Sequence, residues 1–452
     1  MNYLQYSVND LSRRIRSREV RIADIVAASL DRAEALQQKH NTFIELFRDK
    51  ALRQATVLQA EVDKGQWRGP LHGIPLAYKD CFSRKDRLPT VGSKVPITFH
   101  AVDAYVISVL EAKGAIDLGA LNLSEMCAGP SGLNEHFGDC ANAWDPARVS
   151  GGSSSGSAVS VASYQVYGSL GTDTGGSVRI PASMNGIYAL KPTFGLISNS
   201  GCFPRAFSLD CIGPLARSIE DCEIIFDQLI GQQTLKNFDS TCSTTKFAAL
   251  DTNINVHPFI EKQYNNFLDL IMDDFYISSS AKFRDIDVCY VMGDIIAKCE
   301  AATLHKKWMD QYPSYYSSEV YSRTEIGLHI SASMYIEAVR SRAHIVHDFI
   351  ERSFVNADIL VTPSMPIPTP LIADVKCQGD VEAAQEMIKR LTLLTRPFNY
   401  LGLPVLSMPI GIDDNGMPIG VQLIGRPFEE KRLFGAAQKL AGIIGFKGNP
   451  YH

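Results

Sequence analysis

Apolar residues recur at helical spacing in some parts of the chain and form short continuous runs in others. Helical recurrence predicts one helix that begins near Ser7 and another that ends near Phe354. The same spacing, supported by a cap at Ser218 and a stop at Gly231, predicts further helices over 22–38, 102–115, 219–230 and 429–443. Short apolar runs predict buried strands over 74–79, 115–119, 358–363 and 417–425.

Strands and helices alternate along much of the chain, beginning with strand 74–79, helix 102–115 and strand 115–119. Such a βαβ order is typical of α/β proteins. We find no Gly/Ser linker, internal repeat or low-complexity segment. The pattern therefore predicts a single large α/β domain over residues 1–452, with a mixed central β-sheet surrounded by helices.

Two Gly/Ser-rich loops, over 151–157 and 171–177, flank an apolar segment that is about one short helix or strand long. Glycine lets the backbone approach a ligand closely because it has no Cβ. Each loop also presents a serine hydroxyl, and the second can point several N–H groups at one spot, as an oxyanion requires. The two loops together predict a site for nucleophilic catalysis.

A serine nucleophile needs a base, and the histidines do not supply an obvious one. The ten histidines are scattered, and only His72 lies near a distinctive motif. The predicted strand 74–79 ends in Lys79, and a buried lysine can act as a base because desolvation disfavours the ammonium form. Two alternatives are a solvent-exposed Lys79 and a Cys81 nucleophile, although Cys81 would need a glutamate motif that we do not find.

Three motifs in this order resemble those of the amidase signature family. They are G-I-P-x-x-x-K-D over 73–80, G-G-S-S-S-G-S over 151–157 and G-T-D-T-G-G-S-V-R-I-P over 171–181. The resemblance continues through 186–193, 208–214, 399–404 and 420–425, and it is weakest over 232–330. It implies N-terminal helices in 1–60, a catalytic core in 70–215, a variable substrate-funnel region in 232–350, and the last part of the sheet with a closing helix in 355–445.

The resemblance also implies roles for individual residues. Ser177 would be the nucleophile, Ser153 a bridging serine that follows a cis peptide bond, and Lys79 the base. The backbone N–H groups of Thr174, Gly175, Gly176 and Ser177 would hold the oxyanion. The implied reaction is hydrolysis of a carboxamide C–N bond to a carboxylate and ammonia or an amine, through an acyl-enzyme and with no metal or cofactor.

Three residues near these motifs are candidate substrate contacts: Cys127, Ser154 and Arg179. By resemblance, Cys127 belongs to a loop that lines the acyl pocket, although it could equally be a small buried residue. Ser154 takes no part in proton transfer. Arg179 flanks the nucleophile, and we favour a bracing role for it with Asp173 over a contact with a substrate carboxylate.

The variable region holds further candidates without a motif. An aromatic cluster could form a rim for apolar amides or could be ordinary packing; it comprises Trp308, Tyr312, Tyr315, Tyr316 and Tyr321. One residue of a predicted helix could also reach the pocket, and the candidates are Tyr335, Arg340 and Arg342.

Composition limits the classes of binding partner and the cellular compartment that we expect. The 452-residue chain has a net charge of −5 with scattered Lys and Arg, so we expect neither nucleic acid nor an anionic membrane surface as a partner. The ten cysteines form no C-x-x-C pair, which favours buried thiols in the cytoplasm. The N-terminus lacks the apolar segment of a signal peptide, and no run of about 18 apolar residues predicts a membrane span.

Three functions remain open from the sequence. The first is a free-standing amidase that acts on a small-molecule amide. The second is the amidase-type subunit of a glutamine-dependent tRNA amidotransferase, which would pass ammonia to partner subunits. The third, a non-catalytic binding homologue, is disfavoured because all three catalytic side chains are present. The resemblance also makes a homodimer an expectation.

Overall fold

The structure is a computed structural model that describes residues 3–98, 102–231, 245–272, 275–376, 381–448 and 450. Residues 232–244 and 273–274, which belong to the predicted variable region, lie outside the described residues.

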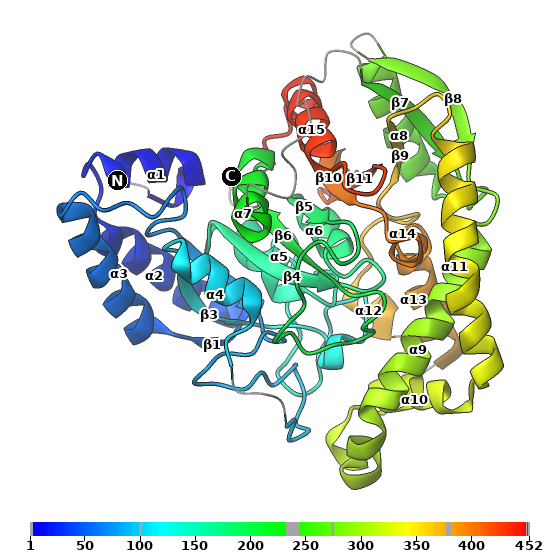
Figure 1. Cartoon of the computed structure of the whole chain (residues 1–452), viewed down its shortest axis with the longest axis horizontal. Coiled ribbons are helices and arrows are strands. Elements are labelled where there is room, and N and C mark those ends of the chain that lie inside the picture. Colours follow the sequence, from blue (N-terminus) through cyan, green and yellow to red (C-terminus); the bar gives the residue numbers. More distant parts are fainter. Residues whose placement is uncertain are drawn as a thin grey trace.

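An 11-stranded sheet forms the centre of the molecule, in the order β1-β3-β2-β4-β6-β5-β10-β11-β9-β7-β8 (Figure 1). Strand β2 is parallel to β3 and β4, and β7 is parallel to β8 and β9, whereas the other neighbours are antiparallel. This mixed sheet confirms the predicted α/β fold. The strands are β1 (Phe43–Leu46), β2 (Pro75–Lys79), β3 (Ile116–Leu121), β4 (Gly168–Asp173), β5 (Tyr188–Lys191), β6 (Cys211–Ala216), β7 (Lys246–Asp251), β8 (Tyr276–Lys282), β9 (Ile359–Pro363), β10 (Val405–Ile412) and β11 (Pro418–Ile424).

Helices surround the sheet, with α2 and α3 packed at the β1 end and α9 and α11 packed side by side at the opposite end (Figure 1). None of the helices in the described ranges is long and apolar enough to cross a membrane. The α-helices are α1 (Val8–Arg16), α2 (Ile22–His40), α3 (Arg48–Asp63), α4 (Tyr105–Ala112), α5 (Ser155–Ala162), α6 (Arg179–Asn185), α7 (Ile219–Ile230), α8 (Pro258–Ile271), α9 (Ile286–Gln311), α10 (Ser318–Glu325), α11 (Ala332–Ser353), α12 (Ile372–Lys376), α13 (Val381–Thr392), α14 (Arg396–Leu401) and α15 (Glu430–Ile444).

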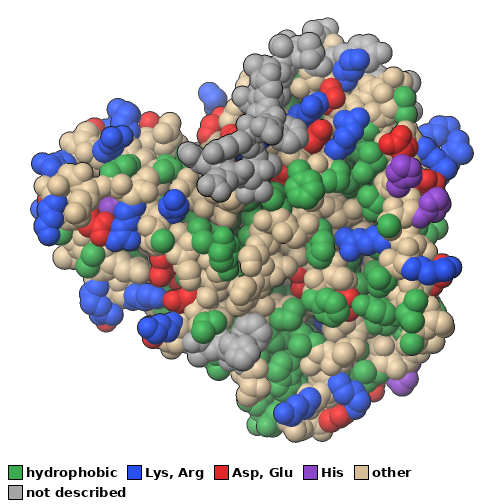
Figure 2. Space-filling view, in the orientation of Figure 1, with side chains coloured by type: hydrophobic (Ala, Val, Ile, Leu, Met, Phe, Trp, Pro, Cys, Tyr) green, Lys and Arg blue, Asp and Glu red, His purple; other side chains and the backbone are tan. Residues whose placement is uncertain are grey.

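Local capping explains why α7 matches its predicted ends. The hydroxyl of Ser218 accepts a hydrogen bond from the N–H of Asp221 at 3.1 Å, and Gly231 ends α7 with φ 67°. Helix α4 is shorter than the predicted 102–115, because Gly114 adopts φ 86° and turns the chain into β3. On the face shown in Figure 2, Lys and Arg side chains are scattered among acidic ones, as the sequence indicated.

The segment between the two serine loops holds both a helix and a strand, where the sequence suggested only one of them. Helix α5 begins at Ser155, inside the first predicted loop, and every one of its residues is buried. Strand β4 follows and pairs in parallel with β2. Because parallel neighbours end at the same edge of a sheet, the ends of β2 and β4 place Lys79 beside the second serine loop.

A buried ion pair fixes the chain that leaves β2. The Arg84 Nε atom lies 2.7 Å from Asp117 Oδ2 on β3, and both side chains are almost completely buried. The Arg84 guanidinium also donates to the carbonyl of Gly119 at 3.1 Å and lies over the ring of Phe47 at 5.1 Å. Removing one member of such a pair leaves a buried charge without its partner.

We expect Asp117→Asn to lower the free energy of unfolding by about 3 kcal/mol, because Arg84 would keep its buried charge. The double variant Arg84→Met, Asp117→Asn should recover much of this loss, and urea denaturation of the wild type and the variants measures both changes. A single Asp117→Asn variant as stable as the wild type would contradict this account of the pair.

Candidate active site

Lys79 and Ser153 are in direct contact in the interior. The Lys79 Nζ atom donates to Ser153 Oγ at 2.8 Å and to Thr172 Oγ1 at 2.7 Å. All three side chains are buried. Lys79 comes from the end of β2 and Thr172 from β4, so the parallel strand pair positions the amine against the first serine loop.

The two serine loops are packed on one another. The Ser154 N–H donates to the carbonyl of Ser177 at 3.2 Å, which ties the residue after Ser153 to Ser177 itself. Gly151 has φ 76°, and a Cβ atom there would lie 2.6 Å from the Cα of Pro181. Only glycine fits this contact between the first loop and α6. The peptide bond between Gly152 and Ser153 is cis, as the family resemblance implied.

The Asp173 carboxylate shapes the turn that carries Ser177. It accepts the N–H of Gly176 at 2.8 Å and that of Val178 at 3.1 Å. Arg179 donates to it through Nε and Nη2, each at 3.0 Å. Although burial opposes ionisation, the Arg179 guanidinium holds the pKa of Asp173 well below its usual range.

Helix α14 clamps the same turn from the far end of the sequence. Asn399 donates through Nδ2 to the Asp173 carboxylate at 2.8 Å, and Thr395 Oγ1 donates to the carbonyl of Gly175 at 2.7 Å. A Cβ on Gly176, which has φ 122°, would lie 2.3 Å from Thr395 Oγ1. Gly176 therefore lets this segment close over the turn.

Three predicted contacts need correction. The Gly176 N–H is engaged by Asp173, so it is not available to an oxyanion in this structure. Arg179 is buried and donates to Gln422 and Asn399 at 2.7 Å as well as to Asp173, so it braces the turn and does not face a substrate. Ser154 is also buried, and its hydroxyl donates to the carbonyl of Thr172 at 3.3 Å.

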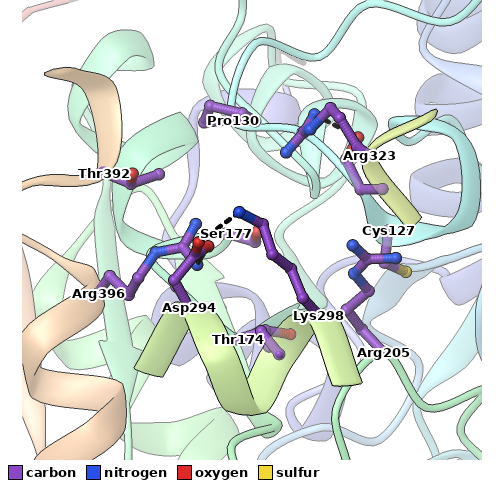
Figure 3. A pocket seen from close by; sticks show the side chains of 14 residues that line it. Cys127, Pro130, Thr174, Ser177, Arg205, Asp294, Lys298, Arg323, Thr392 and Arg396 are labelled. Atoms are coloured by element: carbon purple, nitrogen blue, oxygen red, sulfur yellow. Dashed lines mark hydrogen bonds and ion pairs between the residues drawn. The ribbon is translucent and has the colours of Figure 1, made fainter. Parts of the chain in front are cut away.

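A cavity of about 60 Å³ opens in front of Ser177 (Figure 3). It shares Asp294, Lys298, Arg323 and Arg396 with a second cavity of about 520 Å³, so the space beside Ser177 is the narrow end of a larger opening. Cys127, which the sequence placed near the substrate, is among the lining residues. The lining comprises Cys127, Ala128, Gly129, Pro130, Thr174, Gly175, Ser177, Arg205, Asp294, Ala297, Lys298, Arg323, Thr392 and Arg396.

Charged residues of the lining were missed by the sequence analysis. Asp294 on α9 pairs with Lys298 Nζ at 2.6 Å and with Arg396 Nη1 at 2.5 Å (Figure 3). Arg323 on α10 and Arg205, which precedes β6, complete the set. The i, i+4 spacing of Asp294 and Lys298 is the only local signal among them, and it is equally common on solvated helices.

The tyrosines of the cluster are not among the residues that line this cavity, which favours ordinary packing over an aromatic rim. The Tyr316 hydroxyl bonds His305 Nδ1 at 2.9 Å, and Tyr312 and Tyr315 stack on each other with ring centroids 5.6 Å apart. On α11, Arg342 donates to the carbonyl of Ser208 at 2.8 Å, and neither it nor Tyr335 or Arg340 is among the cavity lining described above.

The buried thiols near the site are poor nucleophiles. Burial raises the pKa of Cys81 well above its usual value. The pKa of Cys127 is also raised well above its usual value, mainly by a hydrogen bond with Cys81 and to a smaller extent by burial. Because the thiolate is the reactive form, these shifts disfavour a cysteine nucleophile at either position.

Comparisons with known proteins agree with the fold and the motifs. The amidase family profile matches residues 24–434. A glutamyl-tRNA(Gln) amidotransferase subunit of Archaeoglobus fulgidus is 33% identical, over 91% of this chain and 93% of that protein. A crystal structure of an amidase superposes with a TM-score of 0.88 at 29% identity, over 97% of this chain and 99% of that one.

A second solved structure is also similar, with a TM-score of 0.89 at 28% identity over 98% of this chain and 99% of that one. It is described as part of a vestigial protein complex that reveals the origins of an s-triazine catabolic enzyme. The family profile spans most of the chain, and the relatives match along nearly all of it. This chain therefore belongs to the amidase family and is a hydrolase of carbon–nitrogen bonds.

Proposed function

We propose that this chain is an amidase that hydrolyses a small carboxamide through an acyl-enzyme on Ser177. The observation that carries the proposal is the buried contact of 2.8 Å between Lys79 Nζ and Ser153 Oγ, beside the turn that carries Ser177. A base, a bridging hydroxyl and a hydroxyl that lines a small cavity are the groups that acyl transfer requires.

In the proposed mechanism, the neutral Lys79 amine takes a proton from Ser153, and Ser153 takes one from Ser177. The Ser177 Oγ atom then forms a bond to the carbonyl carbon of the amide. As the C–N bond breaks, Ser153 gives its proton to the leaving amine and takes one back from the Lys79 ammonium, which restores the neutral amine. Water attacks the acyl-enzyme by the same relay in reverse and releases the carboxylate.

The oxyanion would be held by backbone donors of the Ser177 turn. We propose the N–H groups of Thr174, Gly175 and Ser177, because that of Gly176 is engaged by Asp173. The Asp173 contacts hold the turn in place before substrate arrives, and such preorganisation is where donors contribute most to rate.

A second candidate function is the amidase subunit of an amidotransferase. The 33% identity to a glutamyl-tRNA(Gln) amidotransferase subunit is the observation that favours it. In that case the same Ser177 chemistry would act on glutamine, and partner subunits would receive the ammonia.

The nucleophile can be identified with a fluorophosphonate probe on the purified chain. We expect one adduct, on Ser177, located by peptide mass spectrometry, because the relay activates this hydroxyl. Ser177→Ala should abolish the adduct, whereas Ser200→Ala, at an exposed serine outside the cavity, should not change it. An adduct on another serine would refute the assignment.

The base can be tested with Lys79→Met, which removes the amine while keeping a similar side-chain volume. We expect kcat/KM for a small amide to fall by about 10²–10⁴-fold, the usual contribution of a positioned base. The thermal unfolding midpoint shows whether the variant is folded, and Lys85→Met at an exposed position is the matched control. Near-normal turnover by Lys79→Met at neutral pH would mean that the relay is wrong.

The two candidate functions predict different behaviour of the chain by itself. As a free-standing amidase, it should release ammonia from a small carboxamide without ATP or any partner, and Ser177→Ala should not. Ammonia release only from glutamine, and only after partner subunits are added, would instead establish the amidotransferase function.

A further inference from the structure

The cavity in front of Ser177 has more positive than negative charge. Its lining holds one carboxylate, that of Asp294, and four cations: Arg205, Lys298, Arg323 and Arg396. Asp294 is already engaged by Lys298 at 2.6 Å and by Arg396 at 2.5 Å. Neither of the other two cations, Arg205 and Arg323, forms an ion pair with Asp294.

Arg323 is only partly compensated. Its ion pair with Glu319 spans 3.1 Å, but the Glu319 side chain is 53% exposed, so water and salt screen the attraction. Its other contact is a long one, from Nη1 to the carbonyl of Ala128 at 3.5 Å. Arg323 therefore adds positive potential to the cavity on the side of Cys127 (Figure 3).

Arg205 is held at the cavity through its backbone. The Asp210 carboxylate accepts the N–H of Arg205 at 2.8 Å, the N–H of Ala206 at 3.0 Å and the hydroxyl of Thr174 at 2.5 Å. These contacts join Arg205 to the turn of Ser177. They use the backbone of Arg205 and leave its guanidinium available to a ligand.

The Arg205 guanidinium has no hydrogen bond and no ion pair within the part of the chain that the structure describes, and its Nη1 atom is buried. Burial and the nearby Arg323 lower its pKa to about 10. The Arg205 side chain as a whole is half-buried, and Nη1 is its one nitrogen that is buried without a hydrogen-bond partner among the described residues. Buried polar atoms are nearly always satisfied by a partner. A cation kept in this state beside a reacting serine indicates a ligand that satisfies it.

We propose that Arg205, assisted by Arg323, binds a carboxylate of the substrate. This inference rests on the amidase function proposed above and names its substrate class: short amides that carry a carboxylate, such as monoamides of small dicarboxylic acids. The planar guanidinium fork matches a carboxylate with two parallel hydrogen bonds.

The same lining argues against a substrate with a free ammonium group. Glutamine carries both a carboxylate and an ammonium, and the ammonium would need a carboxylate partner. Asp294 is the only carboxylate in the cavity lining described above, and two cations already occupy it. A site discriminates strongly between two ligands when one of them forms all the buried hydrogen bonds and the other leaves a buried polar group without a partner.

Specificity can be measured with succinamate and its neutral isostere succinamide. We expect the wild type to prefer succinamate in kcat/KM by more than tenfold, and we expect Arg205→Gln to lower the ratio of succinamate to succinamide by about 10–100-fold. Arg205→Lys should restore only part of the ratio, and the matched control Arg340→Gln, which changes an exposed arginine on α11, should leave it unchanged. Equal kcat/KM for both amides in the wild type, or an unchanged ratio in Arg205→Gln, would overturn the inference.

A binding measurement tests the carboxylate site independently of the proposed amidase chemistry. Calorimetry of Ser177→Ala with succinamate should detect binding that the added Arg205→Gln change weakens by about 10–100-fold. Absence of succinamate binding overturns the carboxylate site even if Ser177 reacts with the fluorophosphonate. Conversely, Arg205-dependent binding without any labelling of wild-type Ser177 supports the carboxylate site while the proposed chemistry fails.

The unfolding temperature shows whether Arg205 binds a ligand or supports the fold. Without ligand, Arg205→Gln should unfold at the same temperature as the wild type or higher, because it removes a half-buried charge whose Nη1 atom has no partner among the described residues. Succinate should raise the unfolding temperature of the wild type more than that of Arg205→Gln. A clear fall in the unfolding temperature of ligand-free Arg205→Gln would mean that Arg205 supports the fold, and would overturn the inference.

Discussion

The buried carboxylate of Asp173 is the interaction on which the site depends. It lies at the end of β4 and binds the backbone of the following turn, the Arg179 guanidinium and the Asn399 amide. Transferring such a pair from water to the interior is costly, and only a full set of hydrogen bonds offsets that cost. Gln422 and Asn399 complete the set on the Arg179 side. The Ser177 turn is consequently fixed by groups that do not face the cavity.

These groups come from distant parts of the sequence, and the mixed sheet brings them together. The parallel pair β2 and β4 places Lys79 against the first serine loop. On the other side of β4, the antiparallel strands lead through β5 and β10 to β11, which carries Gln422. Helix α14 precedes β10 and delivers Asn399. The Ser177 turn is thus held by residues from both halves of the sheet. The site therefore depends on the whole domain being folded.

Local signals in the sequence were sufficient for much of the fold. Capping by Ser218 and a glycine stop fixed both ends of α7, and the apolar run before Lys79 gave β2. The contact between Lys79 and Ser153 could be expected only because their motifs occur together in a family. A bracing role for Arg179 was favoured from the sequence. Its partners Gln422 and Asn399 could not be predicted, because they lie more than two hundred residues away.

The cations of the cavity could not be predicted, for a related reason. They come from the segment before β6, from α9, from α10 and from the start of α14, and no spacing in the sequence connects these segments. The tyrosines near residue 315 gave a stronger pattern, yet they pack among themselves and with His305. Aromatic clustering along a chain does not distinguish a rim from a core.

Two arginines near Ser177 show how the same side chain can serve stability or recognition. Arg179 has a carboxylate and two amide oxygens as partners, so its charge is compensated within the fold. Arg205 is joined to the same turn through Asp210 and Thr174, but its guanidinium has no such partner among the described residues. Arg179 is fully buried, whereas Arg205 is half-buried with only its Nη1 atom enclosed without a partner. An anion bound in the cavity would satisfy this donor, so the proposed selectivity comes from a group that the fold itself does not pair.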